Sequence, residues 1–124
     1  MEAVEIVSLQ KHILFLWLAV TVLMTGCQSP STYYWGHYEN LVYIAYTKPD
    51  KAAPESQARV MEEDMHKAIS ANKLLPPGFH AHLGYLYYQM GKTDVALQEF
   101  QKEKAQFPES TVFMDRLIAN LTKK

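Results

Sequence analysis

The chain has 124 residues, of which 48% are hydrophobic and 20% are charged, a composition typical of one small globular domain. Twelve Lys and Arg residues against thirteen Asp and Glu residues give a formal net charge of -1. The charges are scattered and form no run that could follow a phosphate backbone, so we expect no nucleic-acid partner.

The N-terminal segment has the pattern of an export signal. Residues 13–24 (ILFLWLAVTVLM) are nearly all apolar and follow Lys11 and His12. A helix of that length is about 18 Å long, which is too short for a hydrocarbon core of about 30 Å. The segment therefore indicates the apolar region of a signal peptide, which we assign to residues 1–26.

The residues that follow resemble the lipobox of bacterial lipoproteins. Met24 and Thr25 precede Gly26 and Cys27, which is the only cysteine in the chain. In that family the cysteine takes a diacylglyceryl group, with acyl chains such as palmitate, and the signal peptidase cuts between the small residue and the cysteine. Acylation also explains an unpaired cysteine in an exported protein. The resemblance implies a membrane anchor at Cys27, and Gln28 after it implies the outer membrane, facing the periplasm.

A dense group of aromatic residues follows the polar spacer at residues 27–32. A helix over residues 35–46 would be apolar on nearly all sides and must be covered on more than one of them. Two interpretations stay open: the aromatic residues complete the core, or they form an exposed surface for a partner or a glycan. The candidate interaction surface comprises Tyr33, Tyr34, Trp35, Tyr38, Tyr43 and Tyr46.

The next segment predicts an amphipathic helix that begins at Pro54, a residue that suits a first helical position. Three consecutive helical residues point about 100° apart and cannot converge on one ion, so we expect the acidic triplet at residues 62–64 on a solvated face. Glu63 and Lys67 have the spacing of a favourable pair. The apolar stripe of this helix is formed by Ala58, Met61, Met65, Ala68 or Ile69, and Asn72.

Residues 77–108 predict a helical hairpin that resembles one tetratricopeptide motif. Gly84 and Ala96 remove bulk where the two helices cross, and larger side chains fill the space beside the crossing. A single unit cannot bury its own face and is too small for the peptide groove of long arrays, so flanking helices must complete the fold. The residues at matching spacings are Leu83, Gly84, Tyr87, Gly91, Ala96, Phe100 and Pro108, with His80 at the aromatic position.

A last helix over residues 109–121 is expected to cap the hairpin with Phe113, Met114, Leu117, Ile118 and Leu121. The expected fold of residues 33–124 is an all-α bundle of about five helices. His80 and His82 are two residues apart and face different ways on a helix, whereas His37 and His66 stand alone. We therefore expect no catalytic site, no metal site, no cofactor and no small-molecule substrate.

The order of three blocks across residues 27–124 resembles the Gram-negative lipoproteins of the domain of unknown function 4810 family. The blocks are YYWGHYENLVY, PPGFHAHLGYLYYQMGKTD and FPESTVFMDRL. The resemblance implies a tetratricopeptide-related outer-membrane lipoprotein associated with lipoproteins similar to the curli secretion channel. We expect an accessory or assembly factor that contacts another envelope protein or lipoprotein. The alternative is a module that binds peptidoglycan through its Tyr and Trp residues.

The lipobox makes a direct prediction about the chain in a Gram-negative host. A clickable fatty acid should label the wild-type protein, and Cys27→Ala should abolish the labelling because the acceptor thiol is removed. The labelled protein is measured by in-gel fluorescence. An unlabelled wild type, or labelling that persists in Cys27→Ala, would contradict lipidation at this residue.

Overall fold

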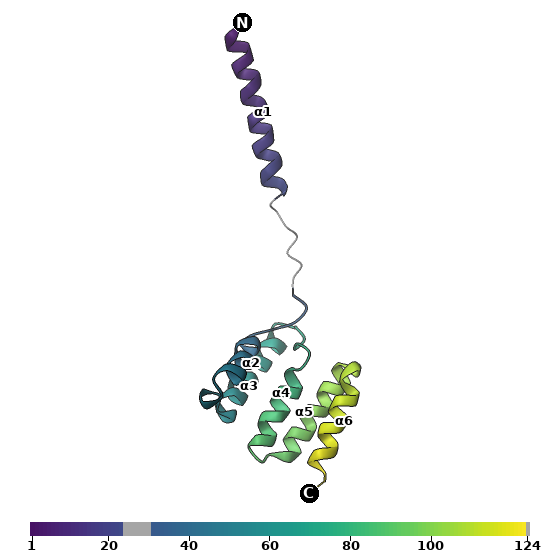
Figure 1. Cartoon of the computed structure of the whole chain (residues 1–124). Helices are drawn as coiled ribbons and strands as arrows, with labels where there is room; N and C mark the ends of the chain where they lie inside the picture. The colour runs from purple at the N-terminus through teal and green to yellow at the C-terminus, as the bar shows by residue number, and fades with distance from the viewer. Residues whose placement is uncertain (24–30, 124) are drawn as a thin grey trace. The chain divides into compact units, whose positions relative to one another are not determined.

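The computed structural model describes residues 1–23 and 31–123, which separate into an N-terminal unit and a larger unit from Ser31 onward (Figure 1). Within these ranges the regular elements are six α-helices and two short 3₁₀-helices, and none of them is a strand. The predicted all-α class is confirmed. Gly26 and Cys27, the predicted cleavage and lipidation site, lie outside the described residues.

The N-terminal unit contains α1 (Glu2–Leu23). The helix is longer than the apolar stretch at residues 13–24 from which it was expected, since it begins near the N-terminus. Leu14, Phe15 and Trp17 are exposed on it. Among the described residues, no helix combines the length and apolar character needed to cross a membrane.

The larger unit holds five α-helices, as the sequence predicts. They are α2 (Tyr38–Thr47), α3 (Pro54–Ser70), α4 (Phe79–Gln89), α5 (Thr93–Gln106) and α6 (Thr111–Leu121), with the 3₁₀-helices η1 (Pro49–Lys51) and η2 (Pro108–Ser110) before α3 and α6. As expected, α3 begins at Pro54. In contrast, α2 begins at Tyr38 rather than near Trp35, because residues 35–38 form a turn in which the Tyr38 N–H donates to the Trp35 carbonyl at 2.9 Å.

Successive helices pack side by side, α3 on α4, α4 on α5 and α5 on α6 (Figure 1). The predicted stripe of α3 is buried at Ala58, Met61 and Ala68, while Ile69 is 70% exposed, so the stripe runs through Ala68. The main core cluster joins α2, α3 and α4 and contains Leu41, Ala58, Met61, Ala68, Leu75, Phe79, Leu83 and Leu86. A second cluster joins α5 and α6 through Ala96, Phe100 and Met114.

The α4–α5 hairpin turns at Gly91, which has φ +73°. This left-handed conformation suits glycine after a helix end. The N–H groups of Gly91 and Lys92 donate to the carbonyls of Tyr88 and Tyr87, both at 2.9 Å, and so satisfy the last turn of α4. The predicted hairpin is therefore present, with its turn where the sequence places it.

Glu103 is an acidic residue of α5 that bonds to the start of α4. Its side chain is buried and reaches from α5 to the start of α4. Oε1 accepts a hydrogen bond from the Gly78 N–H at 2.7 Å, and Oε2 accepts one from the Ala81 N–H at 3.3 Å. A carboxylate near helix N-terminal N–H groups is favourable. Glu103 thus caps α4 from the neighbouring helix.

The helices α4 and α5 approach each other closely at Gly84. A Cβ atom placed on Gly84 would lie 2.7 Å from Cε1 of Phe100 and 3.1 Å from the Ala96 carbonyl oxygen. Phe100 is almost fully buried, so its ring has little freedom to move aside. Gly84 therefore leaves the space that the Phe100 ring occupies, and Ala96 is fully buried beside it.

Gly84→Ala should lower the free energy of unfolding by about 1 to 3 kcal/mol, because overpacking outweighs the usual gain from alanine in a helix. Urea unfolding of residues 31–124 measures the change. Phe100→Leu should cost stability alone but relieve part of the clash when combined with Gly84→Ala, which a double-mutant cycle detects. A stabilising Gly84→Ala would contradict this packing.

Candidate functional site

The aromatic cluster does not form one surface, because the structure divides its members between the core and the solvent. Tyr34 and Tyr38 pack against the main core cluster. The Tyr34 N–H donates to the Leu74 carbonyl at 2.8 Å, and the ring centroids of Tyr38 and Phe79 are 5.4 Å apart. Tyr33 is half-buried and forms a β-bridge with Leu74. The interpretation as core therefore holds for Tyr34 and Tyr38, while the Tyr33 ring centroid lies 6.2 Å from that of Phe107. The candidate interaction surface is correspondingly smaller.

Trp35, Tyr43 and Tyr46 remain exposed, and Tyr46 is 86% exposed. The Trp35 ring stacks on Tyr38, with centroids 6.5 Å apart and an interplanar angle of 26°. These three rings are the exposed members of the predicted surface.

Asp64 holds the arm at residues 33–37 against α3. Its carboxylate is fully buried, and it accepts the His37 N–H at 2.6 Å, while the His37 Nδ1 lies 3.1 Å from Oδ1. Lys67 Nζ lies 3.8 Å from the same oxygen. Gly36 has φ +46°, and a Cβ there would collide with the Asp64 carboxylate. The glycine therefore allows both the turn and the close approach.

This arrangement corrects two predictions about charged residues. Asp64 is not on a solvated face, and His37 does not stand alone, because the arm folds back over α3 from a position 27 residues away in sequence. Glu62 accepts a hydrogen bond from the Tyr87 hydroxyl. Glu63 pairs with Arg59 at 2.7 Å instead of with Lys67. The spacing within α3 could not reveal partners on other segments.

His80 is buried and pairs with a carboxylate on α5. Its Nδ1 lies 2.7 Å from Oε2 of Glu99, and Lys102 Nζ donates to Oε1 of Glu99 at 2.6 Å. Burial raises the pKa of Glu99, but the bonds from His80 and Lys102 outweigh this effect and hold the pKa below its ordinary value. The pair of His80 and Glu99 therefore links α4 to α5.

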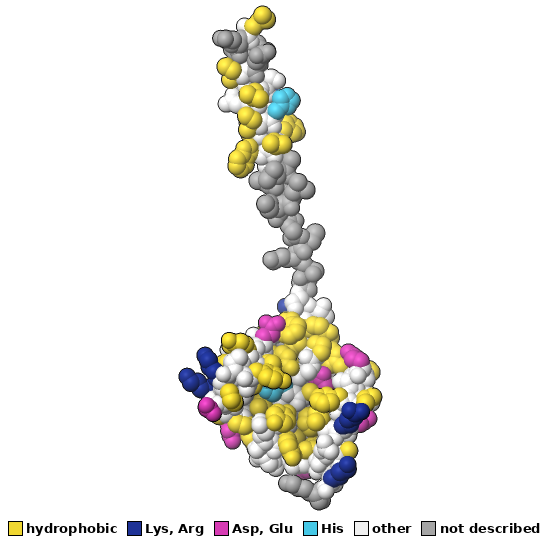
Figure 2. Space-filling view, in the orientation of Figure 1, with side chains coloured by type: hydrophobic (Ala, Val, Ile, Leu, Met, Phe, Trp, Pro, Cys, Tyr) yellow, Lys and Arg dark blue, Asp and Glu magenta, His cyan; other side chains and the backbone are white. Residues whose placement is uncertain are grey.

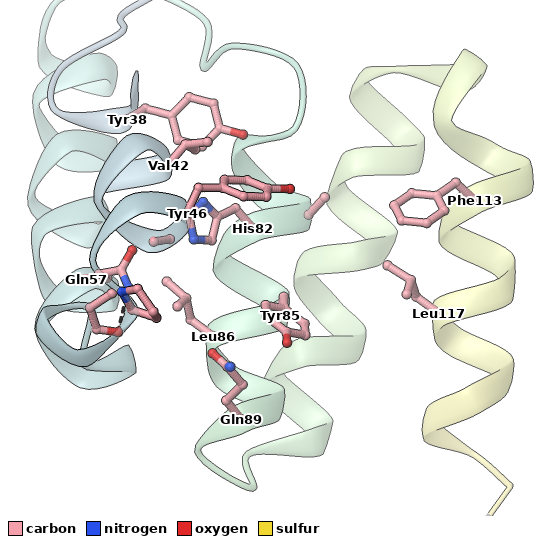
Figure 3. A pocket seen from close by; sticks show the side chains of 14 residues that line it. Tyr38, Val42, Tyr46, Gln57, His82, Tyr85, Leu86, Gln89, Phe113 and Leu117 are labelled. Atoms are coloured by element: carbon pink, nitrogen blue, oxygen red, sulfur yellow. Dashed lines mark hydrogen bonds between the residues drawn. The ribbon is translucent and has the colours of Figure 1, made fainter. Parts of the chain in front are cut away.

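A groove of about 690 Å³ crosses the face formed by α2, α4 and α6, the first, third and fifth helices of the larger unit (Figure 3). In the close-up, side chains from α2 and α4 converge opposite Phe113 and Leu117 of α6. The lining residues are Tyr38, Val42, Ala45, Tyr46, Pro49, Ala52, Gln57, Ala81, His82, Tyr85, Leu86, Gln89, Phe113 and Leu117.

The groove is built by elements on both sides of the hairpin. One hairpin alone was expected to be too small for a groove, but α2 and α6 supply the walls on either side of α4. Phe113 was expected to pack as part of the capping face, whereas the structure exposes it at the groove. On α4 the lining positions are 81, 82, 85, 86 and 89, a helical stripe. That stripe was the signal in the sequence that could have identified the site.

The lining carries no Asp, Glu, Lys or Arg, and its polar groups are few. Burial lowers the pKa of His82 below its ordinary value, so the imidazole is neutral at pH 7. Burial, and then the nearby Glu103 carboxylate, raise the pKa of Tyr38 to about 12, so its hydroxyl stays protonated. The Gln57 Nε2 donates to the Ala52 carbonyl at 2.8 Å. The groove is therefore uncharged at neutral pH.

The arrangement suits binding of an apolar group rather than metal chemistry. Across residues 1–23 and 31–123, no three His, Cys, Asp or Glu side chains come together in a group that could hold a metal ion. Grooves of this volume, with apolar walls and a few polar groups, are typical ligand and partner sites.

Comparison with known proteins identifies one family. The model described as domain of unknown function 4810 matches residues 32–117. No curated protein and no solved structure matches the chain. The matched range contains the arm, the helices α2 to α5 and the part of α6 that supplies Phe113 and Leu117. The family region thus includes every residue that lines the groove.

Asp64→Ala should release the arm and lower the free energy of unfolding by about 1.5 to 3 kcal/mol, because a buried carboxylate that accepts hydrogen bonds is lost. Trp35 is the only tryptophan in residues 31–124, so its emission should shift to longer wavelength as the arm loosens. The measurement is chemical unfolding followed by tryptophan fluorescence.

Glu63→Ala is the matched control, because Glu63 is the neighbouring acid on the same helix and pairs only at the surface. Its effect should stay within about 0.5 kcal/mol. Equal effects of the two substitutions would contradict the assigned role of Asp64.

Proposed function

The chain belongs to the domain of unknown function 4810 family, and from this premise we propose that it is an outer-membrane lipoprotein that docks another envelope protein. In this proposal Cys27 carries the lipid anchor and the helical unit faces the periplasm. The protein acts as an accessory or assembly factor rather than as an enzyme. A lipoprotein of the curli-secretion type is the first partner to test.

The groove between α2, α4 and α6 is the observation that carries the proposal. Tyrosine and phenylalanine side chains line it, and aromatic residues are enriched at the centres of protein interfaces where charged residues are depleted. Figure 2 shows hydrophobic side chains gathered over this face of the larger unit, with charged side chains mostly toward its edge. An apolar centre with a polar rim supports docking of a protein segment.

The dimensions of the groove support a short apolar segment as its occupant. The lining positions on α4 run from 81 to 89, which corresponds to about 12 Å along the helix axis. Two turns of a partner helix span a similar length, so two or three apolar side chains could enter at i, i+3 or i+4, and i+7. The lack of charge in the lining favours uncharged side chains at those positions.

A lipid anchor would support docking by raising the effective concentration of the partner protein near the groove. Each methylene group of a buried acyl chain contributes about 0.8 kcal/mol, and two or more chains give stable anchoring. A groove held at the membrane meets other membrane-bound proteins at a high effective concentration, so a modest contact area is sufficient.

Peptidoglycan binding remains the second candidate because Trp35 and Tyr43 are exposed outside the groove. Flat exposed rings can stack on sugars. Saturable pelleting of residues 31–124 with purified sacculi that is lost in Tyr43→Ala would favour this function over docking in the groove. If the protein does not pellet with sacculi, the proposal of peptidoglycan binding is wrong.

Docking in the groove predicts a difference between two tyrosines of α4. Tyr85 lines the groove and is 50% exposed, whereas Tyr88 lies outside it and is 44% exposed. Chemical crosslinking in cells should capture one defined envelope protein, identified by mass spectrometry. Tyr85→Ala should reduce the crosslinked product about tenfold, equivalent to about 1.4 kcal/mol, because an anchoring contact is removed.

Tyr88→Ala is the control for loss of a half-exposed aromatic ring on the same helix, and it should leave the product unchanged. If the two substitutions reduce the product equally, or if neither does, the groove is not the docking site.

A further inference from the structure

Two polar groups of the groove have no hydrogen-bond partner within the described part of the chain. The Oε1 atom of Gln57 is buried and unpaired, although its Nε2 donates to Ala52. The His82 ring contacts the Tyr38 ring, with centroids 5.9 Å apart, and neither ring nitrogen is hydrogen-bonded to a described residue. In Figure 3 the His82 ring lies between Tyr46 and Leu86 on the groove wall. An apolar groove thus contains two acceptors that are not used within the protein.

The surroundings of His82 keep it available as an acceptor. Tyr38 and Tyr46 from α2 and Gln57 from α3 line the same groove, and no charged side chain does. The carboxylate of Glu103 on α5 bonds to the N–H groups of Gly78 and Ala81. A neutral imidazole presents one donor and one acceptor nitrogen. The ring can therefore receive a proton donor from an occupant.

We propose that the groove takes an indole ring, the side chain of a tryptophan in the partner segment, and that His82 accepts its N–H. This inference rests on the proposed docking function and specifies its ligand. His82 is the specificity-determining residue in this proposal.

The chemistry of the lining favours indole over purely apolar and over cationic anchors. A Trp side chain has a large apolar body with one donor and no acceptor. A Phe or Leu side chain has no donor for the His82 acceptor and would displace solvent from it without replacing the hydrogen bond. A Lys or Arg side chain has donors but would meet no carboxylate among the lining residues. Tyr46, Tyr85 and Phe113 supply aromatic surfaces for a flat ring.

The test compares indole with N-methylindole, two probes that differ in the donor. Residues 31–124 are suitable because both buried clusters lie within them. Each probe is titrated into the labelled protein and followed by NMR. Indole should shift the amide signals of Tyr85 and Leu86, and N-methylindole should bind about three- to tenfold more weakly because it cannot donate to His82.

His82→Phe keeps an aromatic ring but removes the acceptor, so the ratio of the two dissociation constants should fall to within about twofold. His66→Phe, at an exposed position of α3, is the matched control and should retain the wild-type ratio. The amide spectrum reports whether each variant is folded.

A pH series on the wild-type protein tests the same contact without substitution. Burial depresses the pKa of His82, so the neutral ring persists somewhat below the ordinary value near 6.5 and is lost as the pH falls further. Indole affinity should then stay constant down to about pH 6.5 and decrease only as the pH falls further below it, whereas N-methylindole affinity should change less.

Equal affinity for the two probes in the wild type would overturn the role of His82 while leaving the groove as a docking site. Indole shifts confined to residues outside the groove would overturn the inference as a whole. The crosslinking experiment with Tyr85→Ala tests the docking function separately. Failure of the docking proposal and failure of the indole proposal can therefore be distinguished.

Discussion

The contact between Gly84 and Phe100 sets how closely α4 and α5 pack. Since glycine has no side chain, the Phe100 ring can occupy the space beside the α4 backbone, and α5 approaches closely on that side. This approach leaves a different face of α4, at positions 82, 85, 86 and 89, free of the hairpin partner. The groove exists because α4 packs through one side and contributes its other side to a concave surface.

Two buried carboxylates hold this arrangement together by bonding to segments that are distant in the sequence. Asp64 fixes Gly36 and His37 against α3, and Glu103 satisfies the first N–H groups of α4 from α5. Both carboxylates are buried and bonded, as buried charges must be. They fix the positions of α2 and α4, the two helices that form most of the groove wall. Stability and the shape of the groove are therefore coupled.

Much of the fold was predictable from the sequence, whereas most of the groove was not. Helix positions follow from local signals, such as Pro54 at the start of α3 and Gly91 after α4, and the crossing at Gly84 follows from side-chain size. The burial of Asp64 depends on a partner 27 residues away, which no helical spacing encodes. His82 and Phe113 look like ordinary packing residues in sequence. Their place in the groove lining can be recognised only in the folded unit, because α2, α4 and α6 together form the groove.

The central claim is that the face of α2, α4 and α6 receives a partner, and photocrosslinking tests it most directly. A photoreactive benzoyl-phenylalanine is placed at position 85 or, in a separate strain, at position 88, and intact cells are irradiated. The account predicts one defined adduct from position 85 and at most a trace of it from position 88, because only Tyr85 lines the groove. Equal adducts from both positions, or an adduct from position 88 alone, would contradict it.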